Sequence, residues 1–180
     1  MVSSSSDPKF YRLSYLRIKT GLMFDMPTSA QWEYACRAGT PGKFNDGSDS
    51  ISAVGWYSGN WSEDTAISSN MTHEVGLKTS NRWGLYDMHG NVSEYVLERY
   101  YYPEADDGVT YVNPTIPAGH GYTDGYSTYR HIVRGGSFSE SAANCRSAVC
   151  TAAQSGSSSR GYRLWLPAGI PHYGKPAAFK

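Results

Sequence analysis

From Thr40 onward the sequence loses the hydrophobic period of a helix, and this loss constrains the fold more than any other feature. Gly, Ser, Asn and Asp recur every few residues, interrupted only by short aromatic or β-branched pieces such as residues 54–57. The chain has 19 Gly, 15 Tyr and only 18% charged residues, a composition typical of irregular, hydrogen-bonded loops. Its 180 residues suffice for one compact domain with a proper core.

The first helix is expected over residues 10–19, before the loop-rich part begins. Apolar side chains at Phe10, Leu13 and Leu16 recur at helical spacing. Gly21 follows the last of these turns and supplies a stop, because glycine readily adopts the left-handed conformation that ends helices. We therefore expect a short helix here.

A second helix is signalled at both of its ends. Thr28 and Gln31 form a capping box, in which the threonine hydroxyl accepts an early helix N–H and the glutamine reaches back. Gly39 supplies the stop at the other end. Trp32 and Cys36 fall on one face of this helix. The pattern predicts that the helix docks on a core through that face.

Strands are expected where β-branched and aromatic residues adjoin turn residues, at 95–97, 131–133 and 162–166. The segment 100–129 holds three prolines and is full of Tyr, Gly and Asp. A loop of this length inside a compact domain is usually functional or braced by a metal. The resulting organisation is a flexible lead-in at 1–9, a single domain at 10–168 and a tail at 169–180.

Charge and hydropathy exclude several classes of partner. Lys+Arg and Asp+Glu are both 16, and no basic block interrupts this balance, which argues against nucleic-acid or anionic-membrane partners. The apolar runs are too short to span a bilayer. No signal peptide is visible in this chain, and the compartment stays open. Three cysteines give an odd number, so no full disulfide framework is implied.

Four motifs in order carry a family resemblance, which extends from about Leu13 to Leu166. Together they resemble the formylglycine-generating-enzyme (sulfatase-modifying factor) family; the motifs are Met26-Pro27-Thr28 with Gln31-Trp32-Glu33-Tyr34-Ala35-Cys36-Arg37-Ala38-Gly39, Asn81-Arg82-Trp83-Gly84-Leu85-Tyr86-Asp87-Met88-His89-Gly90-Asn91-Val92-Ser93-Glu94, Val133-Arg134-Gly135-Gly136-Ser137-Phe138, and Arg146-Ser147-Ala148 with Gly161-Tyr162-Arg163-Leu164. The resemblance implies an α+β, C-type-lectin-like fold with two short helices and twisted antiparallel strands under long loops. It also implies an N-terminally shortened domain, because the family's first strands are not recognisable.

The arginines and glycines of these motifs have a plain structural interpretation. Arg134, Arg146 and Arg163 are expected to be internal struts that bond buried loop carbonyls, since a loop-rich fold must satisfy many backbone groups. Gly90 and the Gly135-Gly136 pair are expected where a Cβ would block the backbone.

The resemblance implies a calcium site near the second motif. Its ligands would be Asn91, the carbonyl of Val92 and Glu94, a mixed set of hard oxygens that suits Ca²⁺. The alternative is a turn in which Asn91 bonds backbone and Glu94 is solvated. A second set in the long loop could be metal-binding or simply solvated: Asp106, Asp107 and Asp124. No His/Cys spacing indicates zinc.

In active members of the family two thiols bind copper(I), and they follow the Arg-Gly-Gly-Ser-aromatic motif closely. Here residues 139–144 contain no cysteine. Cys145 and Cys150 have the four-residue gap of such a pair but flank a later motif, so they are out of register. If the chain were an oxidase, these two cysteines and Ser137 would form its site. The other interpretations are a small disulfide or buried thiols acting as apolar groups.

Between Phe138 and Arg160 the sequence is mostly small and polar, which suits a binding surface on a stiff scaffold. Some relatives of this family are variable proteins of diversity-generating retroelements, in which adenine-directed mutagenesis introduces substitutions into this region. The alternative is an ordinary small-residue loop in a non-catalytic paralogue. Glu140 and Gln154 are not explained by mutated Asn codons and would be fixed positions. The predicted ligand-binding residues are Ser139, Ser141, Ala143, Asn144, Val149, Thr151, Ala153, Ser155, Ser157, Ser158, Tyr57, Tyr101 and Tyr126.

Three functions follow from these patterns. The first is a non-catalytic binding or display domain, whose residues 139–160 form the surface that binds a protein or other macromolecular ligand. The second is a copper-dependent oxidase that makes formylglycine from a cysteine of a protein substrate. The third is a structural domain of a larger protein. The misplaced cysteine pair favours the first.

Overall fold

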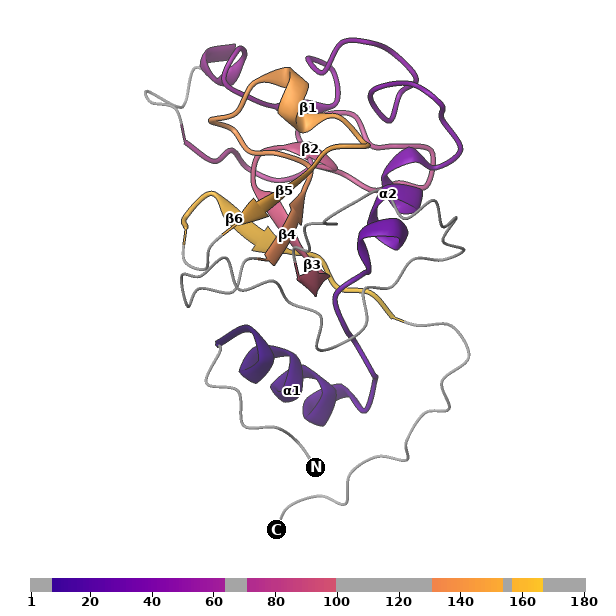
Figure 1. Ribbon diagram of the computed structural model, residues 1–180, viewed down its shortest axis with the longest axis vertical. Helices are drawn as coiled ribbons and strands as arrows, with labels where there is room; N and C mark the ends of the chain where they lie inside the picture. Colours follow the sequence, from indigo (N-terminus) through magenta and orange to yellow (C-terminus); the bar gives the residue numbers. More distant parts are fainter. Residues whose placement is uncertain (1–7, 64–70, 100–130, 154–156, 167–180) are drawn as a thin grey trace, which may run out of the picture. The chain divides into compact units, whose positions relative to one another are not determined.

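The computed structural model describes residues 8–63, 71–99, 131–153 and 157–166 (Figure 1). The chain forms two compact units, one of residues 1–26 with 164–180 and one of residues 27–163. Most of the expected lead-in lies outside the described residues. The expected tail and the whole 100–129 segment, with Asp106, Asp107 and Asp124, lie outside them too. Among the helices that are described, none is long and apolar enough to cross a membrane.

The first unit contains helix α1, Pro8–Thr20, which confirms the helix expected over 10–19. The helix ends as predicted, because Gly21 adopts φ +70° and its N–H donates to the Arg17 carbonyl at 2.9 Å. Arg17 also pairs with Asp25 at 2.9 Å. Asp25 in turn forms an antiparallel bridge with Trp165. The strand expected over 162–166 is therefore wrong in its bounds, since Trp165 makes only this isolated bridge.

The second unit begins with helix α2, Ser29–Arg37, whose capping box is present as predicted. The Gln31 N–H donates to the Thr28 hydroxyl at 3.2 Å, and the Thr28 N–H donates to the Gln31 side-chain oxygen at 2.8 Å. The C-cap is Ala38, at φ 44°, and Gly39 follows at φ 86°. The helix thus ends at Arg37, two residues before the expected glycine, with Ala38 as its cap.

Two sheets complete this unit. The larger sheet has the strand order β5-β4-β3-β6, and the smaller one pairs β1 with β2. The bounds are β1 Gly55–Trp56, β2 His89–Gly90, β3 Ser93–Arg99, β4 His131–Arg134, β5 Cys150–Ala153 and β6 Arg160–Tyr162, with 3-10 helices η1 Trp61–Glu63 and η2 Ala142–Cys145. The strands expected at 95–97 and 131–133 lie within β3 and β4. In the larger sheet β3–β6 is parallel and the other two pairs are antiparallel, so this sheet is mixed, whereas the β1–β2 pair is parallel.

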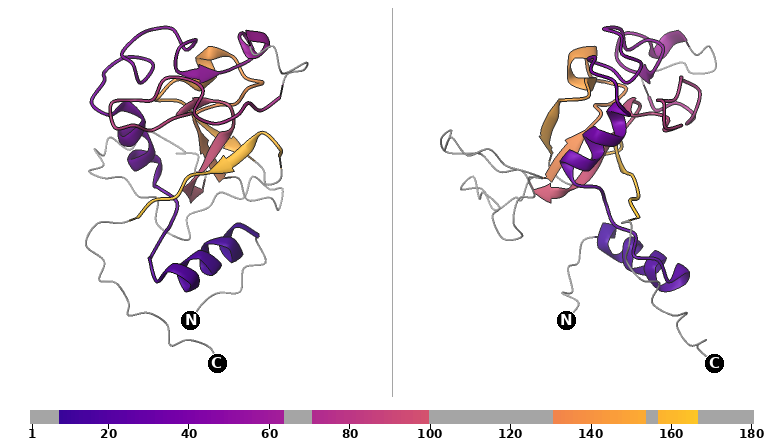
Figure 2. Two further views of the ribbon diagram at one scale, coloured as in Figure 1. Left: turned by 180° about the vertical axis from the view of Figure 1, so that it is seen from behind. Right: turned by 90° about the vertical axis from the view of Figure 1, so that its right-hand side faces the viewer.

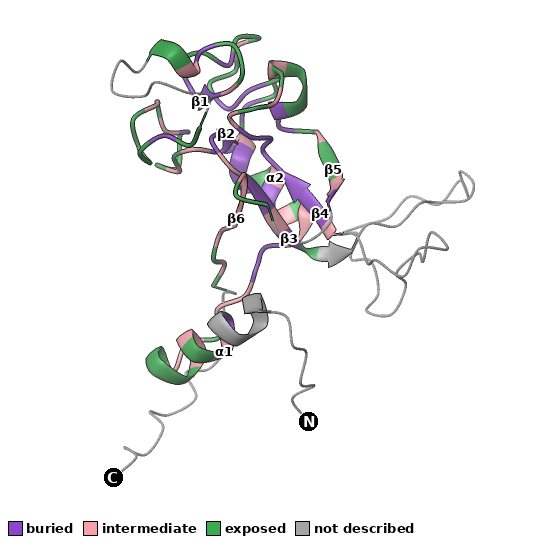
Figure 3. Cartoon of the chain, turned by 90° about the vertical axis from the view of Figure 1, so that its left-hand side faces the viewer, coloured by how far each residue is buried: buried purple, intermediate pink, exposed green. Residues whose placement is uncertain are grey.

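Helix α2 packs against β3 and β4 (Figure 2). The core between them consists of buried side chains from the helix, the second motif and the strands: Trp32, Cys36, Met88, Val96 and Ile132. A second core cluster gathers Phe44, Ile51, Val54 and Cys145. Figure 3 shows burial concentrated on α2 and β4, whereas β5 is largely half-buried or exposed. The expected docking face of α2, with Trp32 and Cys36, is confirmed.

Candidate functional site

The segment after β4 starts with a turn that Glu140 holds in place. The Glu140 carboxylate accepts the Ser137 N–H at 3.1 Å, and the Glu140 N–H donates to the Ser137 carbonyl at 3.0 Å. The Glu140 carbonyl accepts the Ser58 N–H at 3.0 Å. The carboxylate, the N–H and the carbonyl of Glu140 are therefore all engaged in hydrogen bonds within the protein. This is the behaviour expected of a fixed position; Gln154, the other predicted fixed position, lies outside the described residues.

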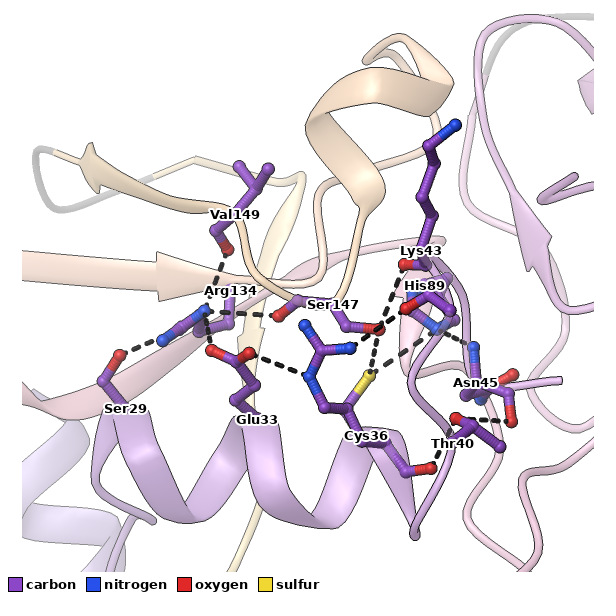
Figure 4. A network of polar contacts seen from close by, with 12 residues as sticks. Ser29, Glu33, Cys36, Thr40, Lys43, Asn45, His89, Arg134, Ser147 and Val149 are labelled. Carbon is purple, nitrogen blue, oxygen red and sulfur yellow. Dashed lines mark hydrogen bonds and ion pairs between the residues drawn. The ribbon is translucent and has the colours of Figure 1, made fainter. Parts of the chain in front are cut away.

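The end of η2 is held to the interior by His89, and the next residues by Lys43, whose contact with Ser147 is drawn in Figure 4. The Cys145 carbonyl lies 2.7 Å from His89 Nδ1, and the Ser147 N–H and hydroxyl both donate to the Lys43 carbonyl, at 3.0 and 3.1 Å. Cys145 and Ser147 are completely buried. The residues on either side of Arg146 are thus held by buried hydrogen bonds, while Arg146 itself is exposed.

Arg134 fixes the path from η2 to β5. Its guanidinium donates to the carbonyls of Ser147 and Val149, both at 3.3 Å, and its Nε donates to the Ser29 hydroxyl at 2.8 Å. It also pairs with Glu33 of α2 at 3.2 Å. Arg134 is therefore the predicted internal strut. Arg146 is not one, because it is exposed and its Nε bonds only the nearby Ala143 carbonyl.

Between Ser139 and Ser158, several small side chains among the described residues are exposed to solvent. We call this set of exposed residues the η2–β5 face. Seven predicted ligand-binding residues belong to it: Ser139, Ser141, Ala143, Asn144, Thr151, Ser157 and Ser158. The pattern did not single out Arg146, Ala148 and Cys150, which are also exposed there. Residues 144 to 148 alternate between exposed and buried, which places Arg146 and Ala148 at the surface, and this alternation is known only from the structure.

Other predicted binding residues are placed differently. Ala153 is buried, at 2% exposure, and Val149 is half-buried. Tyr57 is half-buried and packs against the second core cluster, as does Ala142. Its ring also lies where a side chain on Gly59 would be. The structure thus uses Tyr57 mainly as packing; Ser155, Tyr101 and Tyr126 lie outside the described residues.

The side chains predicted to hold calcium bond other parts of the protein. Asn91 Oδ1 accepts the His73 N–H at 3.0 Å. Both oxygens of Glu94 accept hydrogen bonds from Arg163, at 2.7 and 3.0 Å. Val92, between them, is half-buried. Because these oxygens already have donors, the arrangement does not fit a calcium ion; calcium binding itself stays a prediction.

The three cysteines are free thiols, with Cys36 and Cys145 buried and Cys150 exposed. Burial raises the pKa of Cys36 and that of Cys145 to about 12, so both are protonated near neutral pH. Ser137 is buried as well. A copper(I) pair needs two available thiolates. This arrangement presents only Cys150, of the pair Cys145 and Cys150, to solvent.

Thiol labelling tests this arrangement directly. With a neutral thiol reagent at pH 7.5, we expect one fast-reacting thiol per native chain, and three after unfolding in guanidinium chloride, because only Cys150 is exposed. Cys150→Ser should remove the fast reaction, whereas Cys145→Ser should leave it. Two fast thiols, one of them lost in Cys145→Ser, would contradict the arrangement and favour the copper site.

Taken together, two short helices, a small mixed sheet and long braced loops define an α+β domain of the C-type-lectin-like kind. The sequence matches the sulfatase-modifying factor enzyme 1-like domain family over residues 4–165, so the chain belongs to this family. A curated relative, the chaperone protein LppX of Paenibacillus barcinonensis, is 32% identical over 96 residues, which are 47% of this chain and 34% of the relative.

Three solved structures are similar in fold. Variable protein 1 of Treponema denticola is 29% identical with a TM-score of 0.60, over 78% of this chain and 46% of that one. PvdO from Pseudomonas aeruginosa is 26% identical with a TM-score of 0.62, over 86% and 56%. CarF is 25% identical with a TM-score of 0.54, over 80% and 47%. This chain therefore spans about half the length of these relatives.

Proposed function

We propose that this domain is a ligand-binding module whose contact surface is the η2–β5 face. The observation that carries the proposal is a division within residues 139–158. Side chains that fix the backbone, such as Glu140, Cys145 and Ser147, point inward or bond internally, and most of the side chains between them are exposed and, Arg146 apart, small. Exposed side chains on a rigid backbone can be exchanged without disturbing the fold.

The similarity to a variable protein supports this proposal and favours a protein as the ligand. In a variable protein, substitutions must fall where they leave folding intact. The exposed positions of the η2–β5 face meet that requirement, and Ala153 does not, because it is buried. Catalysis by the copper route would need a second available thiol, and Cys145 is buried.

Two display libraries test the proposal on the full chain. The first randomises six positions of the η2–β5 face, and the matched control randomises three buried positions: Ser139, Ser141, Ala143, Asn144, Thr151 and Ser157 in the first, and Cys145, Ser147 and Ala153 in the second. Protease resistance on the display particle reports folding. Selection against a purified protein probe, such as lysozyme, reports binding.

We expect most clones of the first library to fold and selection to yield binders, while most clones of the control library fail to fold. Reverting the selected side chains should remove binding and leave protease resistance unchanged. A first library that mostly unfolds would place these residues in the core. A folded library that yields no binders would contradict a role in recognition.

A further inference from the structure

Glu94, the second residue of β3, is held by three hydrogen-bond donors. Arg163 approaches it as a fork: Nη2 donates to Oε1 at 2.7 Å and Nε donates to Oε2 at 3.0 Å. The indole N–H of Trp32 donates to Oε2 at 2.7 Å. Glu94 is only 7% exposed, so its charge needs a partner inside the protein. A two-pronged guanidinium contact is among the strongest such partners.

The side-chain amide of Asn91 is also fully hydrogen-bonded within the protein. Its Oδ1 accepts the His73 N–H at 3.0 Å, and its Nδ2 donates to the His73 carbonyl at 3.1 Å. Its own carbonyl accepts the Phe138 N–H at 2.9 Å. Both side-chain atoms of this buried amide are therefore satisfied by the backbone of one residue. Turning Oδ1 toward a metal would leave the His73 N–H without its partner.

A calcium ion at Glu94 would face a further obstacle, which is charge. It requires six to eight oxygen ligands. Here it would have to displace the Trp32 and Arg163 donors and then lie beside the positive charge of Arg163. Like charges at such short range repel strongly where burial excludes water.

We propose that Arg163 is the resident cation of this site, taking at Glu94 the place that the family resemblance assigns to calcium. Arg163 links Glu94 to two segments that lie apart from it in sequence. It follows β6, which pairs with β3 through Glu94 and Gly161, and its Nη2 also donates to the Tyr86 carbonyl at 3.0 Å. The β3–β6 pairing and the segment at Tyr86, just before Met88, are thereby held together without a metal.

Calcium titration of the full chain is the first test, read out by melting temperature after treatment with EDTA. A calcium ion that binds the folded state, at a hundred times its Kd, would raise the melting temperature by about 5 to 10 °C. We expect no such shift. A saturable rise that disappears in Glu94→Gln would overturn the proposal. A rise that persists in Glu94→Gln would place calcium elsewhere and leave Arg163 as the cation at Glu94.

Arg163→Met is the second test, with Arg82→Met as the matched control, because Arg82 is exposed. We expect Arg163→Met to lower the melting temperature by about 10 °C, since it leaves a buried carboxylate without its cation. The pair Arg163→Met/Glu94→Gln should recover most of that loss. If the double variant is no more stable than Arg163→Met, the guanidinium does not act through Glu94. If neither variant folds, the calcium titration of the unsubstituted chain decides.

Discussion

Replacing Gly90 with alanine is expected to leave the domain largely unfolded. Gly90 lies in β2 with φ +71°, a conformation that costs a residue with a side chain about 1 kcal/mol or more. The larger cost is steric, because a Cβ at Gly90 would fall on the Trp56 carbonyl oxygen of β1. Overlap with a backbone atom is not relieved by turning a side chain, so one of the two strands would have to move.

Neither strand can move without losing hydrogen bonds. The Gly90 N–H donates to the Gly135 carbonyl at 2.8 Å, and the Asn91 N–H donates to the Trp56 carbonyl at 2.8 Å. Separating the strands would break the second of these bonds and expose the buried residues of β1 and β2. We expect a loss of about 5 kcal/mol or more, which is comparable to the whole stability of many domains.

Gly76→Ala is the matched control for this prediction. Gly76 also has a positive φ, +82°, but an alanine Cβ there would meet no atom within 4 Å. This variant should lose only about 1 to 2 kcal/mol, from backbone strain alone. Urea unfolding followed by circular dichroism measures both. If Gly90→Ala were no less stable than Gly76→Ala, the close contact between β1 and β2 would be disproved.

The parts of the fold that sequence alone predicts are those set by local chemistry. The capping box of α2 depends on Thr28 and Gln31, three residues apart, and it forms as expected. The stop at Gly21 is equally local. The interior roles of Arg134 and Arg163 follow from a general need, because a loop-rich fold leaves many carbonyls to satisfy. Which carbonyls and which carboxylate they would contact does not follow from this need.

The misplaced expectations concern contacts between residues far apart in the chain. The strand expected at 162–166 failed because β6 is fixed by pairing with β3, more than sixty residues earlier, and the pairing ends at Tyr162. The exposure of Arg146 and the burial of Ala153 likewise depend on the 3-10 turn of η2 and on the pairing of β5 with β4. Local hydrophobicity patterns do not specify which distant residues will pair.

The candidate site shows the same limit. The family resemblance implies calcium at Asn91 and Glu94, whose oxygens are of the kind that Ca²⁺ accepts. Arg163, Trp32 and the His73 backbone change this interpretation, and none of them is near Glu94 in sequence. Glu140 is the opposite case, since an interpretation based on codons alone marked it as fixed, and its internal hydrogen bonds agree with that role.

Acid should destabilise the domain through His89, which is completely buried. Its Nδ1 lies 2.7 Å from the Cys145 carbonyl and must carry the proton, and its Nε2 accepts the Asn45 N–H at 3.0 Å. A second proton on Nε2 would therefore point at another N–H. Burial lowers the pKa of His89 from 6.5 to about 4, and the bond to Cys145 offsets only part of this shift.

The sign of this pH effect on stability follows from comparing the protonation of His89 in the folded and unfolded states. Above pH 6.5 neither state protonates His89, and its neutral form contributes fully to stability. As pH falls from 6.5 toward 4, the unfolded state takes up a proton that the folded state refuses, so stability is lost. Between pH 7 and 4.5 the loss due to this group is about 2 kcal/mol, and it approaches about 3 kcal/mol at lower pH.

Urea unfolding at pH 7 and at pH 4.5 separates His89 from the other groups that titrate in this range. We expect His89→Asn, whose amide can still donate toward the Cys145 carbonyl, to be less stable at pH 7 but to lose about 2 kcal/mol less on acidification than the unsubstituted chain. Equal losses in His89→Asn and the unsubstituted chain would show that His89 is not the acid-sensitive group. A nuclear magnetic resonance titration of the His89 ring would decide the matter if His89→Asn did not fold, because the ring of the native protein should stay neutral at pH 5.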